Sequence, residues 1–227
     1  KLSDYYIELF GIKDTPAAEK EYWEQEHDYL VLQGVLDVTK QQTVLDKHGK
    51  PIRLIGDGVT DNTDNLIKLL EFAGANSQTL YFPEGTYKIT KDIDLSKIAV
   101  YYSTSNYKLI GDENGLSIID GSSNVDKMLE IMNTQYHASM NYVDIEHLVF
   151  NNVGVSVNGP YKKGVILKNN IFINGNYTRE KRADGSVSKA TMEPYIEVNN
   201  SKYLIENNIF LRGEKYPGRG ISTYRSK

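Results

Sequence analysis

The stretch from residue 54 to residue 90, LIGDGVTDNTDNLIKLLEFAGANSQTLYFPEGTYKIT, decides the fold. Asp61 can cap a helix, and the polar residues after it suit a first turn because the helix dipole is positive there. The apolar face that follows comprises Leu66, Ile67, Leu69, Leu70 and Ala73. Gly74 can end the helix in a left-handed conformation. We therefore expect a capping helix over about 62–73, with one apolar side that covers the open end of a strand assembly.

The segment after this helix is expected to begin that strand assembly. TLYF (79–82) has the residue types of a strand, and PEGT (83–86) those of a turn. The alternative for GDGVTD (56–61) is a metal or phosphate site. No phosphate-loop lysine follows these residues, and the carboxylates before the helix would repel anions. The sequence favours the structural role.

An internal repeat predicts what the helix covers. VDIEHLVFNN from Val143, VILKNNIFING from Val165 and YLIENNIFLRG from Tyr203 align at offsets of 22 and 38 residues. The alignment stacks the phenylalanines and asparagines of successive repeats, namely Phe150, Phe172 and Phe210, and Asn170 and Asn208. Repeats of this length with short strands and asparagine turns indicate a β-solenoid, in which each coil buries its inner face against its neighbours.

These motifs resemble the N-terminal entrance of right-handed parallel β-helix proteins of the pectate-lyase-like superfamily, particularly phage tail spikes and tail-associated polysaccharide depolymerases. The resemblance rests on GDGVTDNT, the helix, YFPEGTYKI and YKLIGDENGLSIIDG (107–121), and is dense over 52–121. Members usually have an aromatic-Gly-Ala segment before the Gly-Asp-Gly, where this chain has Arg53, Leu54 and Ile55. The resemblance implies an all-β, single-stranded parallel β-helix.

Residues 1–50 differ in pattern from the rest of the chain. Thr15-Pro16 is a helix-start signal, and the acid-rich run after it reaches Gly34. We expect a helical attachment or linker segment over 1–50 and a β-helix over 51–227, with the solenoid itself spanning about 79–227. The pattern does not change after Phe210, and an open solenoid end exposes strand edges. We therefore expect the chain to be the N-terminal part of a longer protein.

Composition excludes several classes of function. The 227 residues contain no cysteine, so a disulfide framework, a thiolate zinc site and a cysteine nucleophile are all excluded. The net charge of -4, with acidic and basic residues interspersed, argues against nucleic acid as a partner. No apolar run approaches the roughly 20 residues of a membrane span, and we expect no membrane insertion.

One column of charged residues is a candidate for a catalytic pair. The repeat alignment places Glu146, Lys168 and Glu206 at equivalent outward positions of successive coils. At a strand spacing of about 4.8 Å the two glutamates would lie about 9.6 Å apart, near the upper limit for an inverting glycosidase. Lys168 between them favours a surface ion-pair ladder instead.

The 38-residue offset points to a binding region, because insertions in solenoids collect on one face and wall a groove. The insertion, NGNYTREKRADGSVSKATMEPYIEV from Asn174, is rich in charge. We expect Arg179, Lys181 and Arg182 to hold an anionic sugar, and Tyr177 and Tyr195 to stack on sugar rings. The alternative is a charged loop without a ligand.

Asp184 and Glu193 are the candidate catalytic carboxyls of this insertion. Glu193 and Glu197 on one strand would lie about 13 Å apart, which is too far for a catalytic pair. The sequence sets no such limit on the distance between Glu193 and Asp184. The polygalacturonase signatures and the pectate lyase calcium carboxylates are not recognisable, so no metal and no cofactor is assigned. His147 stands where the other repeats have Asn169 and Asn207, and is interpreted as a turn residue.

The resemblance implies a polysaccharide ligand. We expect a phage or prophage tail-spike-like protein that recognises a bacterial surface polysaccharide and degrades it as a lyase or glycoside hydrolase. This predicts a homotrimer in the parent protein, located in the virion tail or outside the cell. Two alternatives remain open, namely a non-catalytic structural or receptor-binding tail module and a secreted bacterial polysaccharide lyase or hydrolase.

Overall fold

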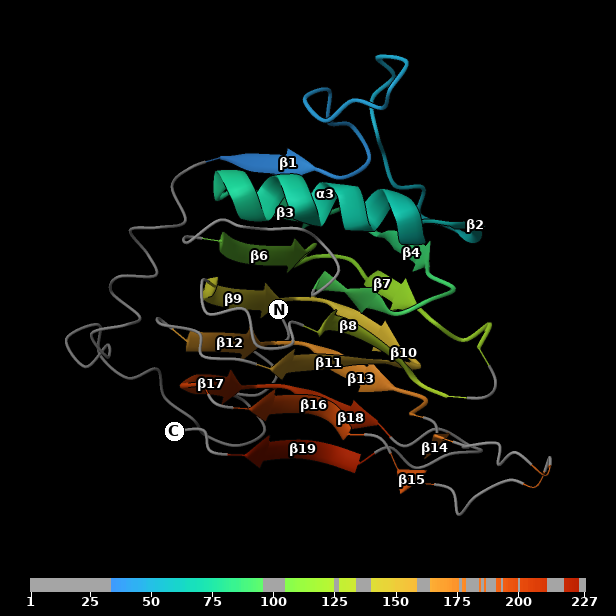
Figure 1. Ribbon diagram of the computed structural model, residues 1–227, viewed down its shortest axis with the longest axis vertical. Coiled ribbons are helices and arrows are strands. Elements are labelled where there is room, and N and C mark those ends of the chain that lie inside the picture. Colours follow the sequence, from blue (N-terminus) through green and yellow to red (C-terminus); the bar gives the residue numbers. More distant parts are fainter. Residues whose placement is uncertain are drawn as a thin grey trace.

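The protein is a right-handed parallel β-helix whose N-terminal end is covered by one α-helix (Figure 1). The computed structural model describes residues 34–95, 105–124, 127–133, 140–158, 164–175, 177–178, 184, 186, 191–192, 194–199, 201–211 and 219–224. Three all-parallel sheets run along the solenoid, and the chain visits them in turn. The predicted fold class is confirmed.

Each sheet gains one strand per coil. The first sheet contains β1 (Val35–Asp37), β3 (Thr79–Phe82), β6 (Ser105–Gly111), β9 (Met140–Glu146), β12 (Gly164–Lys168) and β17 (Tyr203–Glu206). The second contains β2 (Asp57–Asp61), β4 (Gly85–Lys88), β7 (Ser117–Asp120), β10 (Val149–Asn151), β13 (Ile171–Ile173) and β18 (Ile209–Leu211). The third contains β5 (Ile93–Asp94), β8 (Leu129–Asn133), β11 (Val153–Asn158), β16 (Pro194–Asn199) and β19 (Arg219–Tyr224).

The register predicted from the repeat is confirmed. Phe150 pairs with Phe172 and Phe172 with Phe210 on adjacent strands. Their rings stack with centroids 4.9 Å and 5.4 Å apart. Phe150 and Phe172 are fully buried, and Phe210 packs against the same core. Equivalent positions of successive coils therefore fill the interior with like side chains, as repeats stacked in register must.

A ladder of asparagines joins the first sheet to the second. The side-chain amide of Asn170 donates to the carbonyl of Ile145 at 2.9 Å and to Oδ1 of Asn208 at 3.0 Å. Oδ1 of Asn170 accepts the amide of Leu148 at 3.0 Å. Asn170 is fully buried, so each bond satisfies a group that water cannot reach. The prediction that Asn170 and Asn208 form consecutive positions of one turn is confirmed.

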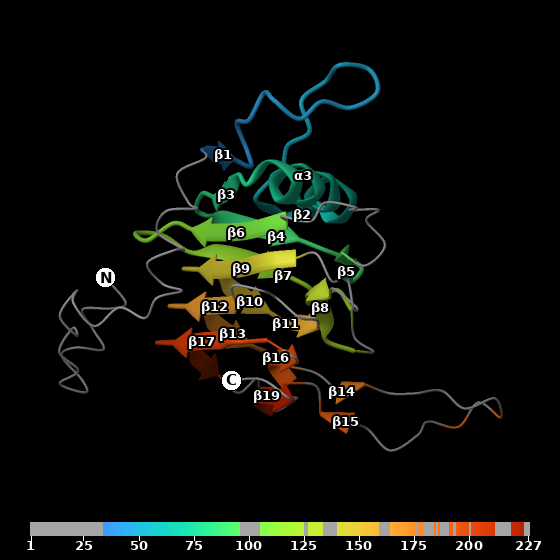
Figure 2. The ribbon, with the colours of Figure 1, turned by 60° about the vertical axis from the view of Figure 1, so that its left-hand side comes forward.

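The capping helix is α3 (Thr63–Asn76), and its apolar side rests on the first coil (Figure 2). Leu66, Leu69 and Leu70 are buried, as their spacing predicted. The expected end at Gly74 is wrong, because the left-handed residue is Ser77 at φ 52°. Gly74 lies inside the helix, where an added Cβ would come within 2.5 Å of the Tyr107 ring. Its role is close packing of the helix on β6.

The turn before the helix explains the glycines and acids of the opening motif. Asp57 accepts hydrogen bonds from the amides of Val59 and Thr60 and from the Thr60 hydroxyl. Asp61 accepts the amide of Thr63 at 3.0 Å, although the residue at the helix N-cap is Asn62. The side chain of Asn62 bonds Ile55 and Thr60 instead. The structural role of this stretch is confirmed, with the cap shifted by one residue.

Two glycines bring the opening turn and the PEGT turn together. Gly85 has φ +156°, and an added Cβ there would lie 3.0 Å from the carbonyl oxygen of Gly56. A Cβ on Gly56 would in turn lie 3.2 Å from the Cα of Gly85. The two backbones can approach this closely only because neither residue carries a side chain.

The N-terminal region is described from residue 34. The predicted helix over 15–33 lies outside the described residues. Residues 35–37 form β1, which pairs in parallel with β3, so the first sheet begins before residue 51. Between β1 and β2 a loop stands beyond α3 at the end of the molecule (Figure 1). Of the helices in the described part of the chain, none has the length and apolarity to cross a membrane.

The insertion after β13 leaves the solenoid as a two-stranded hairpin. β14 (Tyr177–Thr178) pairs antiparallel with β15 (Thr191–Met192). The two strands lie beyond the corner between the second and third sheets, near the C-terminal coils (Figure 2). The insertion therefore interrupts one coil without changing the register of β16 against β11.

Candidate functional site

The outer face of the first sheet carries two adjacent columns of side chains. Strand residues alternate between the interior and the outside, so positions two apart share a face. One column contains Lys108, Asp144, Ile166 and Leu204, and the other contains Ile110, Glu146, Lys168 and Glu206. The charged members lie on β6, β9, β12 and β17, which are stacked along one side of the molecule (Figure 1).

Asp144 and Glu146 form a carboxyl pair at the centre of this face. They stand two residues apart on β9, and their side chains are joined by a hydrogen bond. Lys108 on the neighbouring strand contacts both carboxyls, with Nζ 3.1 Å from Oδ2 of Asp144 and 3.9 Å from Oε1 of Glu146. Asp144 is fully buried, whereas the Glu146 side chain is 20% exposed. Only Glu146 is therefore accessible to a ligand.

The environment of Glu146 raises its pKa to about 7, from an ordinary value of 4.5. Desolvation by burial is the main cause, and the charge of Asp144 adds to it, while Lys108 and Lys168 oppose it. Lys108 lies closer to Asp144 than to Glu146, so its charge favours the ionised form of Asp144, whose charge in turn raises the pKa of Glu146. A carboxyl with this pKa can donate and accept protons near neutral pH.

The other half of the predicted charge ladder is an ion pair. Nζ of Lys168 lies 3.7 Å from Oε2 of Glu206, and the Glu206 side chain is half exposed. The predicted Glu-Lys-Glu register is confirmed, because Lys168 pairs with both glutamates across the strands. Glu146, however, differs from a surface ion-pair residue, because it is largely buried and also contacts Lys108 and Asp144.

Sequence reasoning missed Asp144, and a signal for it was present. The repeat has aliphatic residues at the equivalent positions of the next two coils, Ile166 and Leu204. A single aspartate in an otherwise aliphatic column departs from the repeat, and such departures mark sites that packing does not explain. The sequence could not show that this outward position is fully buried, which is what gives the pair its chemistry.

Most of the binding residues predicted in the insertion lie outside the described residues. This holds for Arg179, Lys181, Arg182 and Glu193, and for the side chain of Tyr177, whose backbone forms β14. Asp184 is exposed, and hydrogen bonds from the hydroxyl and amide of Ser186 lower its pKa. The pairing of Asp184 with Glu193 therefore stays a prediction.

The prediction that Tyr195 stacks on a sugar ring is wrong. Tyr195 is 2% exposed, and its ring packs 5.8 Å from Phe172 and 5.9 Å from Phe210. Its hydroxyl accepts the amide of Gly175 and donates to the carbonyl of Leu211. Tyr195 and the next residue, Ile196, are both buried although they are adjacent in the strand. The Tyr195 ring extends the aromatic stack of the core and anchors the base of the insertion.

The topology separates the insertion from the carboxyl pair. The insertion leaves the solenoid between the second and third sheets, whereas Asp144 and Glu146 lie on the first. His147, next to the pair, has φ 57°, like Asn169 at φ 57° and Asn207 at φ 53°, which confirms it as a turn residue. Among the described residues, no group of three or more acidic or histidine side chains is arranged to hold a metal ion.

Comparison with known proteins places this architecture in a family. The model of the family described as rhamnogalacturonase A/epimerase, pectate lyase-like, matches residues 53–222. That range begins at the opening turn and includes every strand from β2 to β18 and most of β19. No curated protein and no solved structure matches the chain. With three parallel sheets, a helical cap and this match over most of its length, the chain belongs to the rhamnogalacturonase A/epimerase, pectate lyase-like family.

Proposed function

We propose that the protein acts on a polysaccharide that lies across the outer face of the first sheet, with Glu146 as the proton-transferring group. The observation that carries this proposal is the Asp144–Glu146 pair, in which burial and the neighbouring charge raise the pKa of Glu146 to about 7. Carboxyls whose pKa is strongly perturbed by burial and by a specific neighbouring charge are candidates for functional sites. The name of the family, which includes a rhamnogalacturonase and an epimerase, supports a glycan substrate.

The roles of the two carboxyls differ. Glu146 is partly exposed and carries the proton, so it can protonate a glycosidic oxygen or exchange a proton with a sugar ring. Asp144 is fully buried, so it does not touch the substrate. It is a positioning residue whose charge, together with burial, raises the pKa of Glu146, and Lys108 contacts both carboxyls.

The test is a depolymerisation assay on acidic polysaccharides, including pectic polymers and bacterial capsules, with Glu146→Gln beside the parent. We expect the variant to lose at least about a hundredfold in kcat, since general acid–base groups contribute this much or more. Activity of the parent should fall as the pH rises through about 7, where Glu146 loses its proton.

Glu197→Gln is the matched control, because Glu197 lies on β16 of the third sheet and makes the same change of charge elsewhere. Its activity should equal that of the parent. Asp144→Asn should shift the alkaline limb of the pH profile to lower pH, because it removes the neighbouring charge. Full activity of Glu146→Gln on a polymer that the parent degrades would exclude the proposed role.

We further propose that the substrate is a bacterial surface polysaccharide and that the protein is a phage or prophage tail-spike-like protein, homotrimeric and located in the virion tail or outside the cell. The support is the N-terminal motif set of the sequence. The insertion over 174–194, with Arg179, Lys181 and Arg182, is then proposed as a second contact for an anionic polymer. Light scattering on the full chain tests the trimer, and a monomeric mass at high concentration would contradict it.

A further inference from the structure

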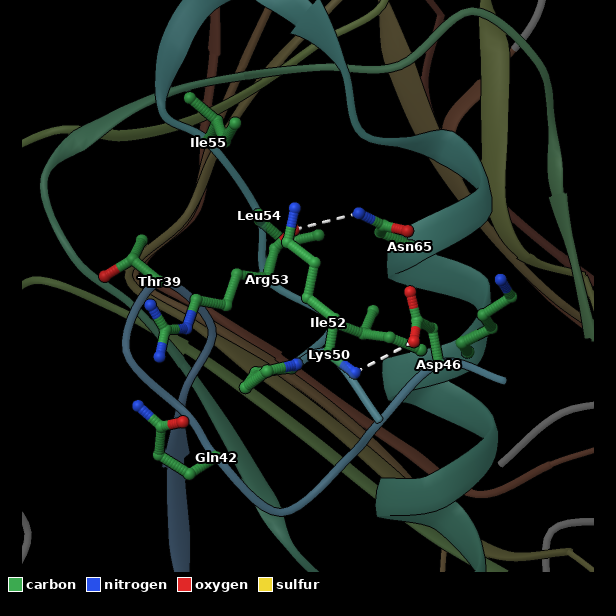
Figure 3. A pocket seen from close by; sticks show the side chains of 11 residues that line it. Thr39, Gln42, Asp46, Lys50, Ile52, Arg53, Leu54, Ile55 and Asn65 are labelled. Carbon is green, nitrogen blue, oxygen red and sulfur yellow. Dashed lines mark hydrogen bonds between the residues drawn. The ribbon is translucent and has the colours of Figure 1, made fainter. Parts of the chain in front are cut away.

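A cavity of about 690 Å³ lies between the loop that joins β1 to β2 and the capping helix α3. Gln41 holds this loop in place, because its Oε1 accepts the amides of Thr43 and Val44 and its amide donates to the carbonyls of Val44 and Ile52. The loop is thus internally bonded, and the cavity it encloses has a defined wall. Figure 3 shows this cavity with its lining side chains.

Three cations line the cavity, namely Lys50, Arg53 and Lys68. None of them forms an ion pair within the described ranges of the chain. Nε of Arg53 donates to the carbonyl of Gln41 at 3.1 Å, which leaves its two terminal nitrogens free to bind. The guanidinium reaches toward Thr39 and Gln42 (Figure 3). In a chain of net charge -4, this grouping is a local positive site.

The one carboxylate of the lining, Asp46, is held mainly by backbone donors. Its Oδ1 accepts the amides of Lys50 at 2.9 Å and His48 at 2.8 Å, so it shapes the turn of the loop. The hydrogen bond from Lys50, followed by that from His48, lowers its pKa. The charges of Lys50 and Lys68 also act on Asp46, after these hydrogen bonds in importance, whereas Arg53 is not among the groups that lower its pKa.

The remaining lining suits a sugar. The Thr39 hydroxyl donates to Asp37 and the Asn65 amide to the carbonyl of Arg53, so these two residues offer acceptor oxygens to sugar hydroxyls, and Gln42 adds an amide. Ile55, which is 51% exposed, offers an apolar surface for the CH face of a ring. The volume lies within the range of roughly 300 to 1,000 Å³ that is usual for ligand pockets. An acidic peptide fits less well, because extended peptides pair with strand edges, and the lining residues belong to a loop and a helix.

We propose that this cavity binds a carboxylate-bearing sugar unit of an acidic oligosaccharide. The cations hold the carboxylate, with Arg53 as its bidentate partner, and the polar side chains bind the hydroxyls. The lining includes no residue of the first-sheet strands that carry the carboxyl pair, so this is a binding site separate from Glu146. The proposal does not depend on whether the protein cleaves the polymer.

The test is a calorimetric titration with an α-1,4-linked galacturonate trimer, with its carboxyl-reduced neutral counterpart and with a glutamate-rich hexapeptide. It is performed in the Glu146→Gln background, so that the probe is not consumed. We expect the acidic trimer to bind, and to bind at least about tenfold more tightly than the neutral trimer, because the charge-assisted bonds are lost in the latter.

Arg53→Gln with Lys68→Gln should weaken binding of the acidic trimer at least about tenfold. The matched control is Lys40→Gln with Lys47→Gln, which makes the same change of charge on exposed residues of the same loop that do not line the cavity. The control should bind the acidic trimer with the affinity of the parent. Both double variants should have the melting temperature of the parent.

Three results would overturn the proposal. These are equal loss of affinity in the control, unchanged affinity in the Arg53 and Lys68 variant, and tighter binding of the hexapeptide than of the acidic trimer. If Glu146→Gln loses depolymerisation but still binds the galacturonate trimer, the two sites are separate. Retained cleavage in Glu146→Gln would remove the proposed function and leave the cavity proposal intact.

Discussion

At the scale of single residues, the property that matters most is the protonation of Glu146. Its pKa of about 7 results from burial and from Asp144, two residues away on the same strand. The face of a β-strand places positions two apart about 7 Å from each other along the backbone, close enough for long side chains to meet. A charge on one member therefore adds to burial in raising the proton affinity of the other.

The pH dependence of stability should reflect the raised pKa of Glu146. Because the pKa of Glu146 in the folded state is above its ordinary value of 4.5, the folded state holds a proton that the unfolded state releases. Its contribution is fully present below about pH 4.5 and is lost as the pH rises through about 7. The melting temperature of the parent should therefore fall between about pH 5 and about pH 8, and fall less in Glu146→Gln, whose amide does not ionise.

Thermal unfolding of parent and variant at both pH values measures this difference. Glu206→Gln is the control, because Glu206 is half exposed and shares the same column of the sheet. If the melting temperatures of the parent and of Glu146→Gln fall by the same amount between the two pH values, the raised pKa of Glu146 is disproved.

At the scale of elements, close backbone approach at the corners decides how coils stack. Gly111 ends β6, and an added Cβ there would overlap the carbonyl oxygen of His147 on the next coil. His147, in turn, is held in a left-handed turn conformation that repeats in the following coils at Asn169 and Asn207. The corner leaves no space for a side chain at Gly111. The coil that contains β6 can therefore stack in this way on the coil that contains β9 only with glycine there.

Gly111→Ala should lower the free energy of unfolding by about 1 to 3 kcal/mol, as overpacking against backbone does. Gly220→Ala is the matched control, because an added Cβ at that position of β19 meets nothing within 4 Å. Denaturant unfolding of both variants provides the comparison. Equal stability of the two would show that the corner can relax, and that the tight contact does not limit the stacking of coils.

At the scale of the whole molecule, burial is uneven along the solenoid. The inward residues of β9 and β12 are fully buried, whereas Tyr203, Ile205 and Phe210 of the last coil are partly exposed. α3 covers the first coil and buries Leu66, Leu69 and Leu70 against it. In a solenoid each coil is stabilised by its neighbours, so the coil with fewer contacts opens most easily.

Hydrogen exchange should follow this gradient. We expect the amides of β17 and β18 to exchange at least about tenfold faster than those of β9 and β10, because local opening of the last coil exposes less apolar surface. Exchange measured by mass spectrometry on peptides from both regions tests this. Uniform protection from β9 to β18 would mean that the coils open as one cooperative unit.

The sequence by itself determined the solenoid, its register and its cap. Stacked Phe150, Phe172 and Phe210, the asparagine turns and the apolar face of α3 all follow from local patterns that repeat. The end of the helix is predicted less accurately. Gly74 suggests a C-terminal stop, whereas in the structure it lies inside the helix and allows close packing against Tyr107. The sequence predicts a ligand contact for Tyr195. Its burial in the core depends on how the strand after the insertion packs, which the local pattern does not show.

Only the tertiary structure decided the candidate site. Spacing shows that Asp144 and Glu146 share a face, but not that one is fully buried while the other is partly exposed, nor that Lys108 contacts both. The cavity of Lys50, Arg53 and Lys68 likewise joins a loop to a helix that begins thirteen residues after Lys50. Burial and proximity depend on how separate segments pack, and it is these two quantities that turn ordinary charged side chains into a proton donor and an anion site.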